Sequence, residues 1–180
     1  MAIPQLTAQE QAEVAGLVAI YISSQRQAFR RQGIPLSAVQ IAAMSAFFSP
    51  GLLDAARLLV LTDTRVQNPH FYPQLAARGF TNLPDFQQMA AITFNDVVVA
   101  HGPFSDGLLF HELVHVEQYR QLGVDHFAEL YVRGFLTGDG YGGIPLEINA
   151  YELGDRFERN PDSKFSIQQE VATWIREDRF

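Results

Sequence analysis

The stretch of residues 105–122 constrains the fold of this chain most strongly, because it combines an apolar helix with three polar side chains. Ser105 or Asp106 can cap a helix there, and Gly123 lies just past its expected end. The apolar residues of this helix point to nearly all sides: Leu108, Leu109, Phe110, Leu113, Val114 and Val116. A helix of this kind is buried in a core, so His111, Glu112 and His115 need partners inside the protein.

The pattern His-Glu-x-x-His at residues 111–115 indicates a zinc site. His111 and His115 are four residues apart, which places both imidazoles on one face of a helix, where they can bind one zinc ion together. Glu112 is rotated by about 100° from His111. It therefore flanks the metal and can act as general base on a zinc-bound water. Zinc is also the partner that two buried histidines require.

A zinc site needs at least a third protein ligand. Gln121 stands six residues after His115, where one arrangement of this kind has a histidine, so we expect an acidic residue from a later helix. Glu147 fits best, because it begins a helix just after the Gly-rich residues 137–143, which let that helix fold back on the first. The alternatives that remain open are Glu152, Asp155, Asp139 and His126.

Composition limits the metal ligands and the partners of this chain. The 180 residues include no cysteine, which excludes disulfides and thiolate ligands, so any metal is held by His, Asp or Glu. The formal net charge is -7, Lys+Arg total 13, and Lys164 is the only lysine. No basic run is long enough to neutralise several phosphates, which argues against nucleic-acid binding.

The N-terminal region shows neither a signal-peptide pattern nor a membrane span. No basic segment precedes an apolar stretch, and the apolar residues 14–22 are a short part of an amphipathic pattern that follows Glu10 and Glu13. We therefore expect a cytoplasmic protein, or one exported without a cleavable signal peptide.

Hydrophobic periodicity and turn signals predict a single α+β domain over residues 1–180 that is mostly helical. Residues 58–61 form an expected strand, and residues 91–94 and 97–100 form a hairpin around Asn95-Asp96. Thr7 and Glu10 predict a capping box for the first helix, which ends at Gly33. Residues 37–48 are apolar on nearly every side and predict a buried helix. Further helices are expected after Ser49, near Leu75, and over residues 105–122, 126–136, 146–158 and 167–177.

The residues around the motif carry a family resemblance. Residues 110–118 resemble the active-site helix of the gluzincin metallopeptidases, and still more an uncharacterised bacterial zincin-like family that is common in toxin and contractile-injection-system proteins. Residues 91–100 are similar to the strand pair that precedes this helix in such proteins. The resemblance covers about residues 58–156 and implies a zincin-like fold, in which a small twisted sheet packs on the active-site helix.

For the site, the resemblance implies His111 and His115 as zinc ligands, Glu112 as general base and Glu147 as third ligand. The interval between His115 and Glu147 is long and contains an extra helical segment.

These observations predict a zinc-dependent metallopeptidase that acts on a peptide or protein substrate. A second electrophile beside the metal is expected to be Tyr141, with Tyr119 and Tyr151 as alternatives. Residues 97–101 are a candidate rim of the cleft, where an extended peptide can pair with the strand edge. His101 can line that cleft, but a position at a solvent-facing end of the strand is the favoured interpretation. The alternative hypothesis is a catalytically inactive zincin-like binding or structural module that retains the zinc helix.

Overall fold

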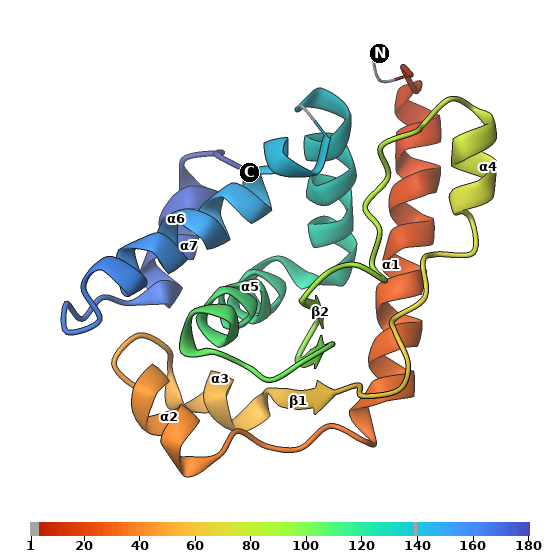
Figure 1. Ribbon diagram of the computed structural model, residues 1–180. Helices are drawn as coiled ribbons and strands as arrows, with labels where there is room; N and C mark the ends of the chain where they lie inside the picture. Colours follow the sequence, from red (N-terminus) through yellow and green to blue (C-terminus); the bar gives the residue numbers. More distant parts are fainter. Residues whose placement is uncertain (1–3, 139) are drawn as a thin grey trace.

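The computed structural model describes residues 4–138 and 140–180 and shows an α+β protein dominated by helices (Figure 1). The strands are β1 (Arg57–Val60), β2 (Ala91–Phe94) and β3 (Val97–Ala100). The helices are α1 (Ala8–Arg30), α2 (Ala38–Met44), α3 (Pro50–Ala55), α4 (Tyr72–Ala77), α5 (Asp106–Thr137), α6 (Pro145–Arg159) and α7 (Ile167–Arg176), with a 3-10 turn at Gly140–Gly143. Among the described helices, none combines the length and the apolar character that crossing a membrane requires.

The sheet has the strand order β1-β3-β2, with β3 parallel to β1 and antiparallel to β2. The predicted hairpin is present, and Asn95 turns it with a φ of 61°, a conformation that asparagine tolerates better than most residues. Asp96 then accepts hydrogen bonds from Arg26 Nε at 2.6 Å and from Arg30 Nη1 at 2.8 Å. These charged contacts fix the hairpin turn on the side of α1.

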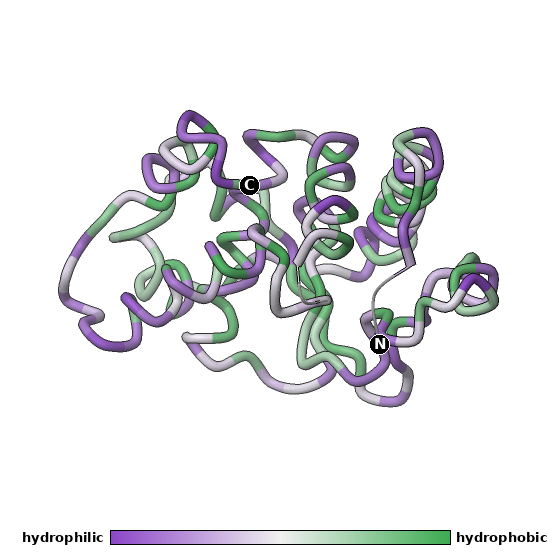
Figure 2. Tube along the Cα trace, turned by 90° about the horizontal axis from the view of Figure 1, so that it is seen from above, coloured by the Kyte–Doolittle hydropathy of each residue, from purple (hydrophilic) through white to green (hydrophobic). Residues whose placement is uncertain are grey.

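Helix α5 is the central element of the fold, because it contacts the sheet on one side and α1, α6 and α7 on others (Figure 1). In Figure 2 the coiled segments alternate between green and purple along their turns, as expected of helices with one apolar side. Strand β3 has no face toward solvent, because all four of its residues are fully buried. The site-bearing helix is therefore packed inside the protein, as its apolar pattern predicts.

Gly123 divides α5 in the place where the sequence predicts a helix stop. The helix continues past it, but Gly123 itself has φ 76° and ψ 165°, which are not helical, so the two predicted helices meet there at a kink. The left-handed φ favours glycine, since a side chain would crowd the backbone. The kink sends the second half of α5 in a new direction, toward the start of α6.

The prediction of a buried helix over residues 37–48 is wrong in two respects. Helix α2 ends at Met44, and it exposes 78% of Val39 and 41% of Ile41, whereas only Met44 is buried. Burial shifts to the residues after the helix: Phe47 and Phe48 pack against Phe110 with ring centroids 5.5 and 5.1 Å away. A helix of two turns at the rim of a fold reaches the core with one residue, so its apolar composition does not predict its burial.

A pair of glycine substitutions tests the kink. Gly123→Ala should lower the free energy of unfolding by about 1 kcal/mol, because alanine disfavours a φ of 76°. Gly16 lies on the exposed side of the regular helix α1, so Gly16→Ala should raise the free energy of unfolding by about 0.5–1 kcal/mol. A Cβ at either position meets no atom within 4 Å, so the backbone alone decides the sign. Urea unfolding measures both, and equal signs would contradict this account of the kink.

Candidate metal centre

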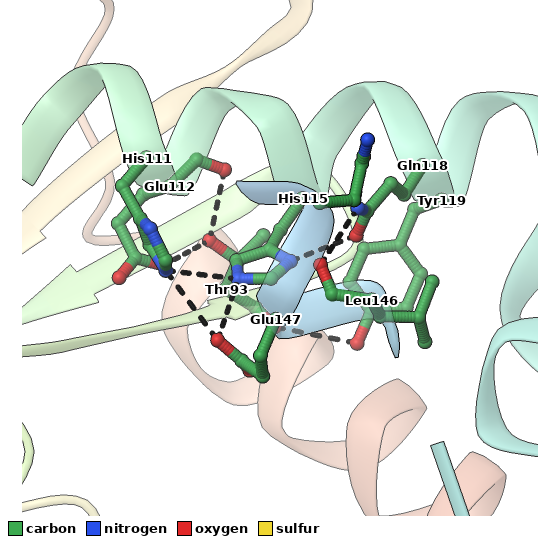
Figure 3. Close-up of polar contacts among 9 residues, drawn as sticks. Thr93, His111, Glu112, His115, Gln118, Tyr119, Leu146 and Glu147 are labelled. Carbon is green, nitrogen blue, oxygen red and sulfur yellow. Dashed lines mark hydrogen bonds and ion pairs between the residues drawn. The ribbon is translucent and has the colours of Figure 1, made fainter. Parts of the chain in front are cut away.

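The imidazoles of His111 and His115 lie next to each other on one face of α5 (Figure 3). Their Nε2 atoms are 3.2 Å apart, and the rings are nearly perpendicular with centroids 4.8 Å apart. His115 is buried, whereas His111 retains some exposure on its outer side. The spacing of four residues on a helix accounts for this arrangement.

Glu147 completes a group of three donor atoms from the first turn of α6. Its Oε2 lies 3.5 Å from His111 Nε2 and 3.4 Å from His115 Nε2. Helix α6 can approach this closely because residue 134 of α5 is a glycine: a Cβ there would lie 2.6 Å from Pro145 Cδ. Pro145 opens α6, so the close contact at Gly134 sets where the Glu147 carboxylate points.

The spacing of these three atoms suits a metal ion. Zinc bonds of about 2.0–2.1 Å in a tetrahedron put neighbouring ligand atoms about 3.3–3.5 Å apart. The observed separations of 3.2, 3.4 and 3.5 Å fall in or beside that range. Glu147 Oε2 is also buried and accepts no hydrogen bond from any described residue, an arrangement that is costly unless a cation sits beside it. His111, His115 and Glu147 can therefore hold a metal ion.

Without a metal, a proton must take the place of the cation. Burial by itself lowers the pKa of His115, but the charge of Glu147, with a smaller contribution from Glu112, raises it to about 9 in the ion-free protein. Burial raises the pKa of Glu147, but His115 and His111 hold it well below its usual range. The ion-free protein thus keeps an imidazolium against a carboxylate at neutral pH, and metal binding has to displace that proton.

Gln118 determines which nitrogen of His115 faces the cluster, and sequence reasoning missed this role. Its Nε2 donates to Leu146 O at 3.0 Å and to Asn149 Oδ1 at 2.9 Å. Because a carbonyl oxygen can only accept, Gln118 must present Oε1 to His115 Nδ1, which donates to it at 2.8 Å (Figure 3). The lone pair of neutral His115 therefore lies on Nε2, toward His111 and Glu147.

Thr93 holds the carboxylate of Glu112, another contact that sequence reasoning missed. Its hydroxyl donates to Glu112 Oε2 at 2.6 Å and lies 3.2 Å from the Glu112 carbonyl oxygen. Thr93 belongs to β2, so the sheet positions this side chain from outside the helix (Figure 3). Glu112 is 5% exposed and lies outside the three-donor group, beside it.

Two hollows meet at this site. The inner cavity, of about 70 Å³, has apolar walls that include Val18, Ile22, Phe86, Phe94, Phe127 and Tyr131, and polar groups at one end: Glu112, His115 and Glu147. The outer cleft, of about 470 Å³, is lined by Leu108, His111, Tyr151, Gly154, Asp155 and Glu158. Both are lined by Met89, Ala91, Glu112 and Tyr141. The three donor atoms therefore lie where the inner cavity and the outer cleft adjoin.

The tyrosine candidates differ in their surroundings. Tyr141 lines both hollows, and burial together with the Glu147 charge raises its pKa, so its hydroxyl stays protonated. Tyr119 is buried with its ring 3.8 Å from that of Phe127, and its hydroxyl donates to Thr93 O at 3.4 Å. Tyr151 lies in the outer cleft with its ring 4.5 Å from that of His111. Of the three, Tyr141 has the position expected of a donor to a ligand.

The other candidate ligands lie apart from the three-donor group among the described residues. Glu152 is exposed, and Asp155 pairs with Arg159 at 3.6 Å on the open side of the outer cleft. His126 pairs with Glu129 at 3.1 Å on the surface. Asp139 lies outside the described residues.

The prediction that residues 97–101 form the cleft rim is wrong. Strand β3 is the central strand, paired on both sides, so it has no free edge. His101 accepts a hydrogen bond at Nε2 from the Val66 N–H at 3.0 Å, and its Nδ1 donates to Met89 O at 2.7 Å. It ties two loops to the end of β3 and lines neither the inner cavity nor the outer cleft. The order of strands in a sheet depends on long-range pairing, which residue patterns do not reveal.

Comparisons with protein-family models, with curated proteins and with solved structures gave no significant match. The gluzincin resemblance therefore stays a prediction, and the functional argument depends on the geometry of the site.

The pH dependence of stability should differ between the ion-free and the zinc-loaded protein. In the ion-free protein the pKa of His115 is about 9, above the 6.5 of a free histidine, so the native state binds the extra proton. Its free energy of unfolding should fall as pH rises from 6.5 toward 9. Zinc requires neutral imidazoles, so the zinc-loaded protein should gain stability up to about pH 6.5 and lose none above it. Urea unfolding with chelator and with one equivalent of zinc measures both; parallel curves would contradict the metal site.

Substitution of Gln118 tests its control of His115. Gln118→Leu removes the acceptor for His115 Nδ1, so the zinc dissociation constant should rise by about 10- to 100-fold in competition with a chromogenic chelator. Gln121→Leu is the matched control, since Gln121 lies three residues on in α5 and bonds Glu117 and Gln168 instead. Equal zinc affinity in the Gln118→Leu variant and the wild type would remove this role.

Proposed function

We propose that this protein is a zinc-dependent hydrolase with a zincin-like site, and that it cleaves peptide bonds. One observation carries the proposal: a buried carboxylate oxygen that accepts no hydrogen bond faces two imidazole nitrogens at metal-ligand spacing, beside a second buried carboxylate at the junction of two hollows. His111, His115 and Glu147 would hold the ion. When bound, zinc supplies a Lewis acid that polarises a carbonyl group and lowers the pKa of water.

Glu112 is the residue that we assign to proton transfer. It lines both hollows, so a water molecule and a substrate at the junction are within its reach. Thr93 holds its Oε2, which leaves the other carboxylate oxygen to accept a proton from water and pass it to the leaving amine. A fixed carboxylate is effective because little rearrangement precedes the proton transfer.

The free edge of β2 is suited to hold an extended substrate. Ala90 O accepts from His101 N at 2.8 Å, and Ala100 O accepts from Leu61 N at 2.8 Å on the other side of β3. By the alternation of an antiparallel ladder, the backbone N–H and C=O of Ala91 therefore point away from β3, toward the free edge. Ala91 lines both hollows, so a peptide paired with it would pass directly over the junction.

The donor set favours catalysis over a purely structural zinc site. Structural zinc is surrounded by four protein ligands, whereas catalytic zinc has three and an open position. The group found among residues 4–138 and 140–180 has three members, and a cleft lies beside it. This arrangement supports turnover rather than an inactive module that retains the zinc helix.

Glu112→Gln tests the proposal. The variant should bind one zinc per chain, as the wild type does, because Glu112 lies outside the donor group, but its cleavage of a mixed peptide library should fall by about 100-fold or more. Glu117→Gln is the control, because Glu117 is buried on the same helix, pairs with Arg120 and lines neither hollow. His115→Ala should lose both zinc and cleavage. Undiminished cleavage by the Glu112→Gln variant would remove Glu112 as the base, and a zinc-loaded wild type that cleaves no peptide would overturn the proposed function.

A further inference from the structure

We propose that residues 66–89 form a cover that His101 holds closed, and that this cover opens as one body and exposes the apolar space beneath it. The segment lies between β1 and β2 in the chain, runs along α1 and includes the short helix α4 (Figure 1). Two cavities lie on its inner side, between it and the helices α1 and α5. The cover would operate with or without a bound metal, so it is a property additional to the proposed function.

Both ends of the cover are bonded to the same imidazole. The Val66 N–H donates to His101 Nε2 at 3.0 Å, and His101 Nδ1 donates to Met89 O at 2.7 Å. A neutral imidazole has one donor and one acceptor nitrogen, so these two bonds use both. His101 directly follows β3, the central strand of the sheet. It therefore fastens the first arm of the cover to the end of the second from a fixed position.

The two arms of the cover are also bonded to each other. Asn68 donates from Nδ2 to Asp85 Oδ1 at 2.9 Å and accepts from the Phe86 N–H at 2.8 Å. One amide side chain thus bonds the opposite arm through both its nitrogen and its oxygen, as in compact loops that are packed by their own side chains. We therefore expect the arms to move together rather than one at a time.

Side chains, rather than the backbone, hold the cover on the protein. Within the described part of the chain, every backbone–backbone hydrogen bond of residues 66–89 stays inside the segment. Two polar contacts outward are the bond from the Tyr21 hydroxyl to Gln67 O at 2.6 Å and the surface ion pair of Arg78 with Glu10. Surface ion pairs contribute little to stability. Opening of the cover should therefore cost much less free energy than unfolding of the sheet or of α5.

The apolar contact beneath the cover is incomplete. Besides the inner cavity, a second cavity of about 50 Å³ lies between the cover, α1 and the second half of α5, and its walls include Val14, Phe80, Leu83, Val132 and Phe135. Empty space deprives the atoms that line it of dispersion contacts, so it lowers the cost of separating the cover from the helices. Tyr72 of the cover lines both cavities, so its movement would open both.

The absence of cysteine from the chain allows a specific test by thiol labelling. Val132 is buried in the wall of the second cavity, so the thiol of a Val132→Cys variant should react mainly when the cover is open. Adding His101→Ala removes both bonds at the ends of the cover and should accelerate labelling by about 5- to 100-fold. Adding His126→Ala instead should leave the rate unchanged, because His126 bonds Glu129 on the surface.

A second thiol position distinguishes opening of the cover from unfolding of the whole protein. Val171 is buried on α7 and lines neither cavity. His101→Ala should therefore leave the labelling rate of Val171→Cys unchanged. Equal acceleration at both positions, or no acceleration at Val132→Cys, would overturn the role of His101.

Hydrogen exchange of the wild type tests the common movement of the arms, and it does not require that the His101 variant folds. The amides of Val66 and Gln88 lie on different arms and should have equal protection factors, lower than those of the β3 amides. In Asn68→Ala the two protection factors should separate. Unequal protection in the wild type, or protection of both amides as strong as that of β3, would overturn the cover. Equal protection that persists in Asn68→Ala would overturn the coupling of the arms by Asn68.

Discussion

The buried carboxylate of Glu147 against the imidazoles of His111 and His115 is the contact on which the rest of the site depends. It exists because α6 lies close against α5: Gly134 admits Pro145 near the start of α6, and Phe110 stacks on Phe157 with ring centroids 4.4 Å apart farther along. Two apolar contacts thus force three polar groups together in a core, where each is costly alone. A cation relieves that cost, whether a metal ion or a proton.

The residues around this cluster fix the orientation of its side chains. Gln118 orients His115 and bonds α6, and Thr93 orients Glu112 from the sheet, so two residues outside the three-donor group fix the positions of these side chains. Such outer contacts are expensive to bury unless they are fully bonded, and Gln118 makes three hydrogen bonds in complete burial. The outer cleft and the inner cavity adjoin at this cluster, so a substrate can reach it from the outer cleft.

The sequence predicts what depends on local periodicity and little of what depends on long-range packing. The spacing of His111 and His115, the capping box at Thr7, the hairpin at Asn95 and the break at Gly123 follow from one helix or one turn, and the structure contains each. The exposure of α2 and the central place of β3 depend on which elements pack together, and the predictions of a buried helix and of a cleft rim are wrong there. Glu147 is an intermediate case: the Gly-rich loop suggests a returning helix, but only packing at Gly134 decides which acidic residue reaches the histidines.

The central claim is that His111, His115 and Glu147 together hold one divalent ion. Diffraction data collected on both sides of the zinc absorption edge, from crystals of protein purified with zinc, test it most directly. The account predicts a single strong anomalous peak at bonding distance from the Nε2 atoms of both histidines and from Glu147 Oε2. A map with no peak there, in a protein that keeps these three side chains together, would contradict it.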